Sequence, residues 1–373
     1  MIRQNFNAGW TVEKGDGNSR MNSFLGNTQT KTVHLPYDAM IHEARTPDTK
    51  NGAQTGFYPG GEYIFQKHFT APQAWQGKPV SLVFEGVYQT ALVYLNGWLL
   101  TRNVNGYAEF TVEAGPYLKY GADNLLKVIA DNSLEPNSRW YTGSGIYRPV
   151  RLLVGNKVYL PQDTVRITTR EADEGFALLD VTAQVQSAST VTERVTLQQT
   201  ICREGTAVLT DRQNLLLQPG ESRTVSFRYC VDSPALWSPE NPNLYTSTMQ
   251  VLEGEEELDR EETGFGIRTL SIDAAHGVRI NGQTVKLRGA CIHHDNGILG
   301  AATLPDAEER RIRQLKEAGF NAIRSSHHPA GRALLDACDR YGVLVMDELS
   351  DVWNVRKNPY DLSLIHISEP TRH

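Results

Sequence analysis

The stretch NAIRSSHHPAGRALLDACDRYGVLVMDE, residues 321–348, decides how the C-terminal part of this chain folds. The segment 321–323 is short and continues into the apolar Ala322 and Ile323, as a buried strand should, and residues 343–346 form a second, apolar strand. Between them, apolar side chains recur every three or four positions, which predicts a helix that Pro329 opens and Gly342 ends. A strand, a helix and a second strand in this order predict parallel strands of an α/β barrel.

Polar side chains collect where both predicted strands end. They are Arg324, Ser325, Ser326, His327 and His328 after the first strand, and Asp347 and Glu348 after the second. An α/β barrel carries its chemistry at the C-terminal ends of its strands. The sequence therefore predicts a functional site that contains a guanidinium, imidazoles and carboxylates.

This stretch resembles the signature of glycoside hydrolase family 2, the β-galactosidase and β-glucuronidase family. The family's Asn-x-x-Arg-x-x-His-Tyr-Pro is matched at Asn321, Arg324, His327 and Pro329, with His328 in place of the usual Tyr. Three more segments resemble family motifs in the family's order, namely RWYTGSGIYRPV (139–150), LWSPENPNLY (236–245) and LRGACIHHD (287–295). In the last of these, Arg288, Gly289, His293 and Asp295 match, while Cys291, Ile292 and His294 depart.

The resemblance extends over residues 1–361 and agrees with a three-domain organisation. Residues 1–158 contain short β-branched and aromatic strands with no helical period, which predicts an all-β jelly roll. Residues 159–269 contain alternating strands typical of an immunoglobulin-like β-sandwich. Residues 270–361 switch to strand–helix alternation and are predicted to form the first part of a (β/α)8 TIM barrel, with room for about three of the eight strands.

The last twelve residues, LSLIHISEPTRH (362–373), do not continue the barrel pattern. They resemble a translated sequencing adapter. We expect a C-terminally truncated family member whose natural sequence ends near Asp361, followed by an artefactual tail.

Composition excludes several classes of protein. The chain has 373 residues, a net charge of −6 and a pI of about 6.0, so no bulk basic field attracts nucleic acid or anionic membrane. No apolar run approaches the roughly 18 residues of a membrane span, and the N-terminus lacks a secretory signal. We expect a cytoplasmic protein with four widely spaced, reduced and buried cysteines. A disulfide between Cys202 and Cys230 is the alternative.

The resemblance implies a retaining exo-β-glycosidase that hydrolyses terminal β-glycosides, with β-D-galactosides first and β-glucuronides second. It implies a carbohydrate substrate, a full-length homo-oligomer and no organic cofactor, and it leaves Mg²⁺ or Na⁺ open. Two alternatives stand beside it. One is a carbohydrate-binding β-sandwich protein without hydrolytic activity, and the other is a short protein whose barrel is completed by a second chain.

Retaining hydrolysis needs two carboxylates about 5 Å apart, one as nucleophile and one as acid. The resemblance places both on glutamates of later barrel strands, with the acid in an Asn-Glu pair. The printed sequence contains no Asn-Glu pair. We therefore assign no catalytic residue and expect the chain alone to be inactive.

The remaining candidates form part of a sugar pocket. The predicted substrate-binding residues are His327, Arg324, His293, Asp295 and Trp353, and the predicted supporting residues are Asp347 and Glu348. Structural alternatives are a buried ion pair for Arg324, a structural imidazole for His327 and rim packing for Trp353. Residues 137–139 are further candidates from the first domain. The histidines and Asp295 also suggest zinc, but their spacing fits no helical metal motif, so we predict no metal site.

Overall fold

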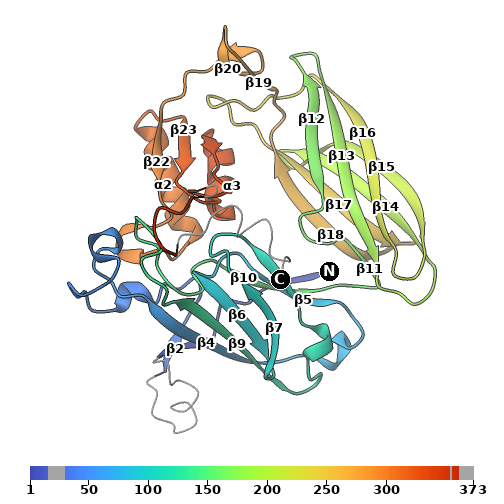
Figure 1. Ribbon diagram of the computed structural model, residues 1–373. Helices are drawn as coiled ribbons and strands as arrows, with labels where there is room; N and C mark the ends of the chain where they lie inside the picture. The colour runs from blue at the N-terminus through green and yellow to red at the C-terminus, as the bar shows by residue number, and fades with distance from the viewer. Residues whose placement is uncertain (16–29, 353–354, 361–373) are drawn as a thin grey trace.

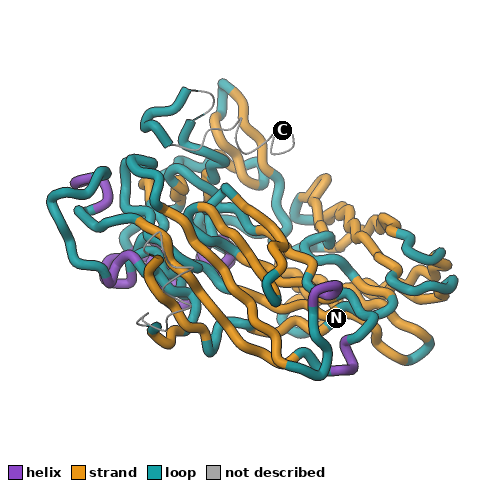
Figure 2. Tube along the Cα trace, turned by 60° about the horizontal axis from the view of Figure 1, so that its bottom comes forward, coloured by secondary structure: helices purple, strands orange, loops and turns teal. Residues whose placement is uncertain are grey.

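A computed structural model describes residues 1–15, 30–352 and 355–360. Within these residues the chain forms two antiparallel β bodies and one smaller α/β body (Figure 1). Strands dominate the trace, and helices are short (Figure 2). The predicted fold class, a jelly roll followed by a sandwich and the first part of a barrel, is confirmed. None of the helices in the described part of the chain is long and apolar enough to span a bilayer.

The first body, called the jelly-roll body, packs two antiparallel sheets around one core. One sheet has the order β1 (Ile2–Asn5), β10 (Val150–Val154), β5 (Val80–Phe84), β8 (Phe110–Glu113). The other has the order β3 (Lys31–Val33), β2 (Trp10–Gly15), β4 (Gly61–Thr70), β9 (Asp123–Asn132), β6 (Thr90–Leu95), β7 (Trp98–Asn103). Alternate residues of β9 are buried, as a strand with one face on the core requires. Asn96 and Gly97, at φ 52° and 91°, make the tight turn between β6 and β7.

The second body, called the sandwich body, also has two antiparallel sheets and its own core. One sheet contains β11 (Val158–Tyr159), β12 (Arg166–Ala172), β13 (Phe176–Ser187) and β16 (Ser222–Asp232). The other has the order β15 (Thr206–Leu217), β14 (Glu193–Arg203), β17 (Tyr245–Glu253), β18 (Glu256–Phe265). Cys202 and Cys230 lie on different sheets and are both free, so the alternative disulfide is wrong. The expectation of four buried thiols is also wrong, because only Cys338 is buried.

The third body, called the barrel body, begins with the antiparallel strands β19 (Leu270–Asp273), β20 (Gly277–Ile280) and β21 (Gln283–Thr284). Three parallel strands follow, in the order β22 (Gly289–Ile292), β23 (Ala322–Ser325), β24 (Leu344–Met346). They alternate with α2 (Pro305–Glu317) and α3 (Arg332–Tyr341). Short 3₁₀ turns elsewhere are η1 (Met40–His42), η2 (Gly52–Thr55), η3 (Gln73–Trp75), η4 (Gly115–Tyr117) and η5 (Gly297–Leu299).

The parallel sheet has two different faces. Ile323 and Val345 lie side by side in register on the face that packs against the helices, in one cluster with Ile312 of α2 and Leu334 of α3. Arg324 lies on the opposite face, where its register partners are Cys291 and Met346. This alternation sends the guanidinium away from the helices, toward the side that forms the interior in a closed barrel.

Polar contacts join the three bodies. Arg332 at the start of α3 donates to Glu109 of the jelly-roll body at 2.8 Å and to Asp163 of the sandwich body at 2.9 Å. The indole N–H of Trp237 in the sandwich body donates to the carbonyl of Asp339 in α3 at 2.8 Å. The barrel body is therefore anchored to both β bodies.

Gly342 provides a test of this anchoring. Its φ is 69°, and a Cβ there would lie 2.3 Å from the carbonyl oxygen of Pro239 in the sandwich body. Gly277 has a similar φ of 67°, but a Cβ added there would have no other atom within 4 Å. Gly277→Ala should cost about 1 kcal/mol in backbone strain, and Gly342→Ala about 2 kcal/mol more because of the clash. Urea titration monitored by fluorescence measures both. Equal shifts of the unfolding midpoint would contradict a close packing of the two bodies.

Candidate functional site

Arg324, His327 and Glu348 meet at the C-terminal ends of β23 and β24. The Glu348 carboxylate bridges the other two groups, with Oε1 paired to Nε of Arg324 and Oε2 2.8 Å from Nδ1 of His327. The hydrogen bond and charge of Glu348 raise the pKa of Arg324. All three side chains line an open pocket of about 580 Å³. Since the Arg324 side chain is 45% exposed, this ion pair is not a buried structural one.

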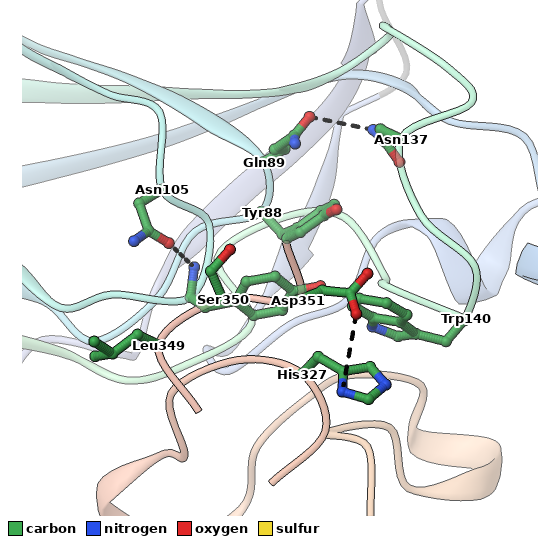
Figure 3. Close-up of a pocket in the computed structure, with 10 residues that line it drawn as sticks. Tyr88, Gln89, Asn105, Asn137, Trp140, His327, Leu349, Ser350 and Asp351 are labelled. Atoms are coloured by element: carbon green, nitrogen blue, oxygen red, sulfur yellow. Dashed lines mark hydrogen bonds and ion pairs between the residues drawn. The ribbon is translucent and has the colours of Figure 1, made fainter. Parts of the chain in front are cut away.

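The jelly-roll body supplies the facing wall of the site. A smaller hollow, continuous with the open pocket through His327 and residues 349–351, is lined by Trp140, Asn137, Gln89 and further residues of the first body (Figure 3). Asn137 donates to Oε1 of Gln89 at 3.2 Å and to Oδ1 of Asn132 at 2.6 Å. These bonds hold the side-chain amides of Asn137 and Gln89 in fixed orientations. Oδ1 of Asn137 is buried and has no hydrogen-bond partner among the described residues.

Asp351 joins the two walls. Its carboxylate pairs with Arg139 of the jelly-roll body, accepts from Nζ of Lys357 at 3.0 Å and lies 4.0 Å from Nδ1 of His327. Burial alone would raise the pKa of Asp351, but the hydrogen bonds from Arg139 and Lys357 outweigh it, so the pKa is lowered. Asp351 is therefore an anion that fixes two cations at the pocket rim.

The other predicted site residues lie around this group. The ring of His293 stacks on the ring of Trp140, with the two ring centroids 5.3 Å apart. Nδ1 of His293 lies 2.7 Å from the carbonyl oxygen of Ser326. Asp347 accepts a hydrogen bond from the backbone of Ala330 at 2.8 Å. Asp295 lines neither part of the pocket. Trp353 lies outside the described residues.

The five candidate metal ligands do not converge. Within the part of the chain that the structure describes, no three His, Cys, Asp or Glu side chains are grouped as a metal site requires. His293 and His294 each point a ring nitrogen at a backbone carbonyl, at 2.7 and 2.8 Å. Each of these two contacts requires an N–H on the ring nitrogen that faces the carbonyl.

His294 and His328 form a buried pair beneath the pocket. Nδ1 of His294 lies 3.2 Å from Nε2 of His328, and Nε2 of His294 lies 2.8 Å from the carbonyl of Thr142. The His328 ring stacks on Tyr107 at 4.4 Å. Burial, aided by the charge of Arg148, lowers the pKa of His328 to about 3 and lowers that of His294 well below its usual value. Both imidazoles are therefore neutral near pH 7.

This pair should make the protein acid-sensitive. Because the unfolded histidines bind protons near pH 6.5 and the folded ones do not, stability falls as the pH drops below that value. From pH 7 to pH 5 each histidine should cost about 2 kcal/mol. His328→Tyr, which restores the family's residue, should remove about half of this loss, as measured by thermal unfolding at the two pH values. The exposed His34→Tyr is the control, and an equal effect of both variants would contradict the buried neutral pair.

Asp38 fixes residues 139–144 of the jelly-roll body, here called the wall loop, to the barrel body. Its carboxylate is 2% exposed and accepts hydrogen bonds from the backbone N–H groups of Met40, Ser144 and Ala301 at 2.8–3.0 Å, and from the Tyr141 hydroxyl at 2.6 Å. Burial raises the pKa of Asp38, although these hydrogen bonds oppose the shift. Tyr141 directly follows Arg139 and Trp140, so Asp38 holds the loop that carries them.

Replacing one carboxylate oxygen of Asp38 by an NH2 group should weaken the attachment of the wall loop to the barrel body. Asp38→Asn must turn an NH2 group toward an N–H donor, and we expect a loss of about 3 kcal/mol in stability. Asp123→Asn, at an exposed carboxylate paired with His68, should cost less than about 1 kcal/mol. Chemical denaturation measures both. Similar small losses would show that Asp38 does not hold the interface.

Sequence reasoning missed one part of the wall. Tyr88, Gln89, Asn105 and Tyr107 line the hollow but belong to jelly-roll loops without a recognisable motif. The clustered amide side chains of residues 103–105 are the only signal that was available. Asp351 and Lys357, which the sequence analysis also did not predict, lie in an irregular segment after β24.

Comparisons with known proteins agree with the order of the three bodies. Residues 10–176 match the profile described as glycosyl hydrolase 2 galactose-binding domain-like, and residues 158–268 match glycosyl hydrolases family 2. Residues 274–363 match the family 2 TIM barrel domain. The chain belongs to glycosyl hydrolases family 2. The resemblance drawn from the sequence motifs is thereby confirmed.

Relatives of this family 2 chain include β-galactosidases and β-glucuronidases. A β-galactosidase of Bacteroides ovatus is 37% identical over 96% of this chain and 42% of its own length. A putative β-glucuronidase of Formosa agariphila is 32% identical over 96% of this chain and 34% of its own length. A solved family 2 structure from Bacteroides cellulosilyticus superposes with a TM-score of 0.92 at 35% identity, over 97% of this chain and 47% of that one. The chain thus spans less than half the length of these relatives.

Proposed function

We propose that the protein to which this chain belongs is a retaining exo-β-glycosidase, with terminal β-D-galactosides as its first candidate substrates. The observation that carries the proposal is the pocket in which Arg324, His327 and Glu348 meet a wall of jelly-roll side chains. Groups that end parallel barrel strands are typically functional. The similarity to the Bacteroides ovatus β-galactosidase supports the choice of sugar.

We assign His327 to binding of the sugar hydroxyls. Nδ1 of His327 is occupied by Glu348 at 2.8 Å, which fixes the ring and leaves Nε2 for a ligand. The Trp140 ring lies edge-on to His327 at 5.5 Å and also lines the hollow, so it can shield one side of a bound sugar from water.

We assign Glu348 to orientation of the site and not to bond cleavage. Both of its oxygens are engaged, one with Arg324 and the other with His327. A catalytic acid or nucleophile needs an oxygen that can reach the glycosidic bond. The two catalytic carboxylates are therefore proposed to lie outside the printed chain, and the chain alone is proposed to lack hydrolytic activity.

A β-glucuronidase is the second candidate. The Formosa relative supports it, as does the Bacteroides uniformis β-glucuronidase structure, which superposes with a TM-score of 0.84 at 27% identity over 96% of this chain and 43% of that one. A carbohydrate-binding protein would have the same pocket as a glycosidase and would differ from it only because it does not hydrolyse the bound sugar.

Chromogenic substrates test the proposal. The product of the complete gene should release nitrophenol from the aryl β-D-galactoside, or from the β-D-glucuronide for the second candidate, with retention of configuration by NMR. The printed chain should release none. Failure of the complete protein to cleave any aryl β-glycoside would favour the binding protein.

His327→Ala in the complete protein tests the assigned role. Loss of one hydrogen bond to the sugar should raise KM about tenfold, with a further fall in kcat if the bond tightens in the transition state. His276→Ala is the control, because His276 lies on the β19–β20 turn with an exposed side chain. An unchanged KM in a folded His327→Ala protein would remove His327 from the binding site.

A further inference from the structure

An exposed pair of aromatic side chains lies on the jelly-roll body, outside the pocket. Trp98 at the start of β7 is 66% exposed, and Tyr117 at the end of η4 is 38% exposed. Their ring centroids lie 6.5 Å apart, and the two ring planes are tilted by 47°. The other tryptophans of the described residues are buried or partly buried. Trp98 and Tyr117 are here called the aromatic platform.

Two asparagines hold the aromatic platform in place. The side-chain amide of Asn96, in the β6–β7 turn, donates to the carbonyl of Tyr117 at 2.9 Å and to Oδ1 of Asn124 at 2.8 Å. Asn124 is fully buried and exchanges two further hydrogen bonds with the backbone of Lys119, at 2.8 and 2.9 Å. The turn that carries Trp98 and the loop that carries Tyr117 are thus joined before any ligand binds, which lowers the entropic cost of binding.

The aromatic platform is separate from the pocket. Trp98 and Asn103 are the first and last residues of β7, so five steps of about 3.3 Å place them roughly 17 Å apart. Asn105, which lines the hollow, follows two residues after this strand. Neither Trp98 nor Tyr117 lines the open pocket or the hollow. The strand β7 therefore leads from the aromatic platform to the wall of the pocket.

The aromatic platform is too small for a stable protein interface. Trp98 and Leu99 are successive residues of β7 and pair with Leu95 and Tyr94 of β6, so their side chains leave opposite faces of the strand. Leu99 therefore does not extend the platform. Two aromatic side chains bury at most about 500 Å², whereas a stable interface buries about 800 Å² on each partner. This area suits a small, flat ligand.

A sugar has the chemistry that these two side chains require. The indole N–H of Trp98 and the hydroxyl of Tyr117 make no hydrogen bond within the described residues, so both can bond sugar hydroxyls while the rings supply apolar surface. One face of β-D-galactopyranose presents the hydrogens of C3, C4 and C5 together, and this face can stack on an aromatic ring. The centroid separation of 6.5 Å is comparable to the length of one sugar unit, so the two rings can contact neighbouring sugars of a chain.

We propose that Trp98 and Tyr117 form a carbohydrate-binding site separate from the pocket, which binds two adjacent sugars of a β-linked galactan. The inference goes beyond the proposed glycosidase function, and only the choice of galactose rests on that function. Because β7 connects the aromatic platform to the pocket wall, a glycan held at the platform stays close to the pocket. Its effective concentration at the pocket is raised in this way.

Affinity electrophoresis of the 373-residue chain, in gels that contain soluble β-1,4-galactan, tests the proposal without turnover. Galactan should retard the unchanged chain, and Trp98→Ala should weaken the apparent affinity about tenfold. Trp98→Phe keeps an aromatic face and should retain most of the retardation. Leu99→Ala is the matched control, because Leu99 is exposed on the opposite face of the same strand, and it should change nothing. His327→Ala, in the pocket, should not abolish the retardation.

Tryptophan fluorescence gives an independent measurement. Iodide should quench the exposed Trp98, and galactan should protect a part of the emission that is missing from Trp98→Phe. Dextran, an α-linked glucan, should neither protect this emission nor retard the chain. Equal effects of dextran and galactan would overturn the choice of a β-galactan.

Three results would overturn the inference. They are no retardation by galactan, equal retardation of the unchanged chain and Trp98→Ala, and a dimer in sedimentation that Trp98→Ala dissociates. The second result, combined with a loss of retardation in His327→Ala, would place all binding in the pocket. The third would show that a second copy covers the aromatic platform. None of them decides the glycosidase proposal, which is tested by turnover of aryl glycosides by the complete protein.

Discussion

The site depends on one buried carboxylate that holds two bodies together. Asp38 accepts hydrogen bonds from its own turn, from the loop at residues 141–144 and from the backbone of Ala301 beyond β22. A Cβ on Gly300 would lie 2.2 Å from Oδ2 of Asp38, so glycine is required for this approach. A buried charge is tolerable only when it is fully hydrogen-bonded. That requirement fixes the wall loop relative to the parallel strands.

The wall loop converts a strand-end cluster into a pocket. By itself, the parallel sheet would present Arg324, His327 and Glu348 to solvent. The loop adds Trp140 over His293 and brings Arg139 to Asp351. The side chains that would contact a sugar thus come from two bodies. Their relative position depends on the interface and not on either body alone.

Two buried neutral histidines lie between the jelly-roll body and the barrel body. His328 stands where the family signature has Tyr, and it pairs with His294, which also departs from the family motif. The two changes lie in contact with each other, at 3.2 Å. Tyr107 packs against both rings, so the two residues that depart from the motif lie in one aromatic cluster.

The sequence by itself determined the fold class, because periodicity and turn pairs such as Asn96-Gly97 act over a few residues. It also indicated Arg324, His327 and Glu348 as neighbours, since parallel strands bring their ends to one edge. Only the tertiary structure decided that Glu348, and not Asp347, pairs with Arg324, because that choice depends on which way each side chain leaves the strand end. It alone brought Arg139 to Asp351, 212 residues apart in the chain. Contacts of such separation are set by how complete bodies pack, and no local pattern encodes them.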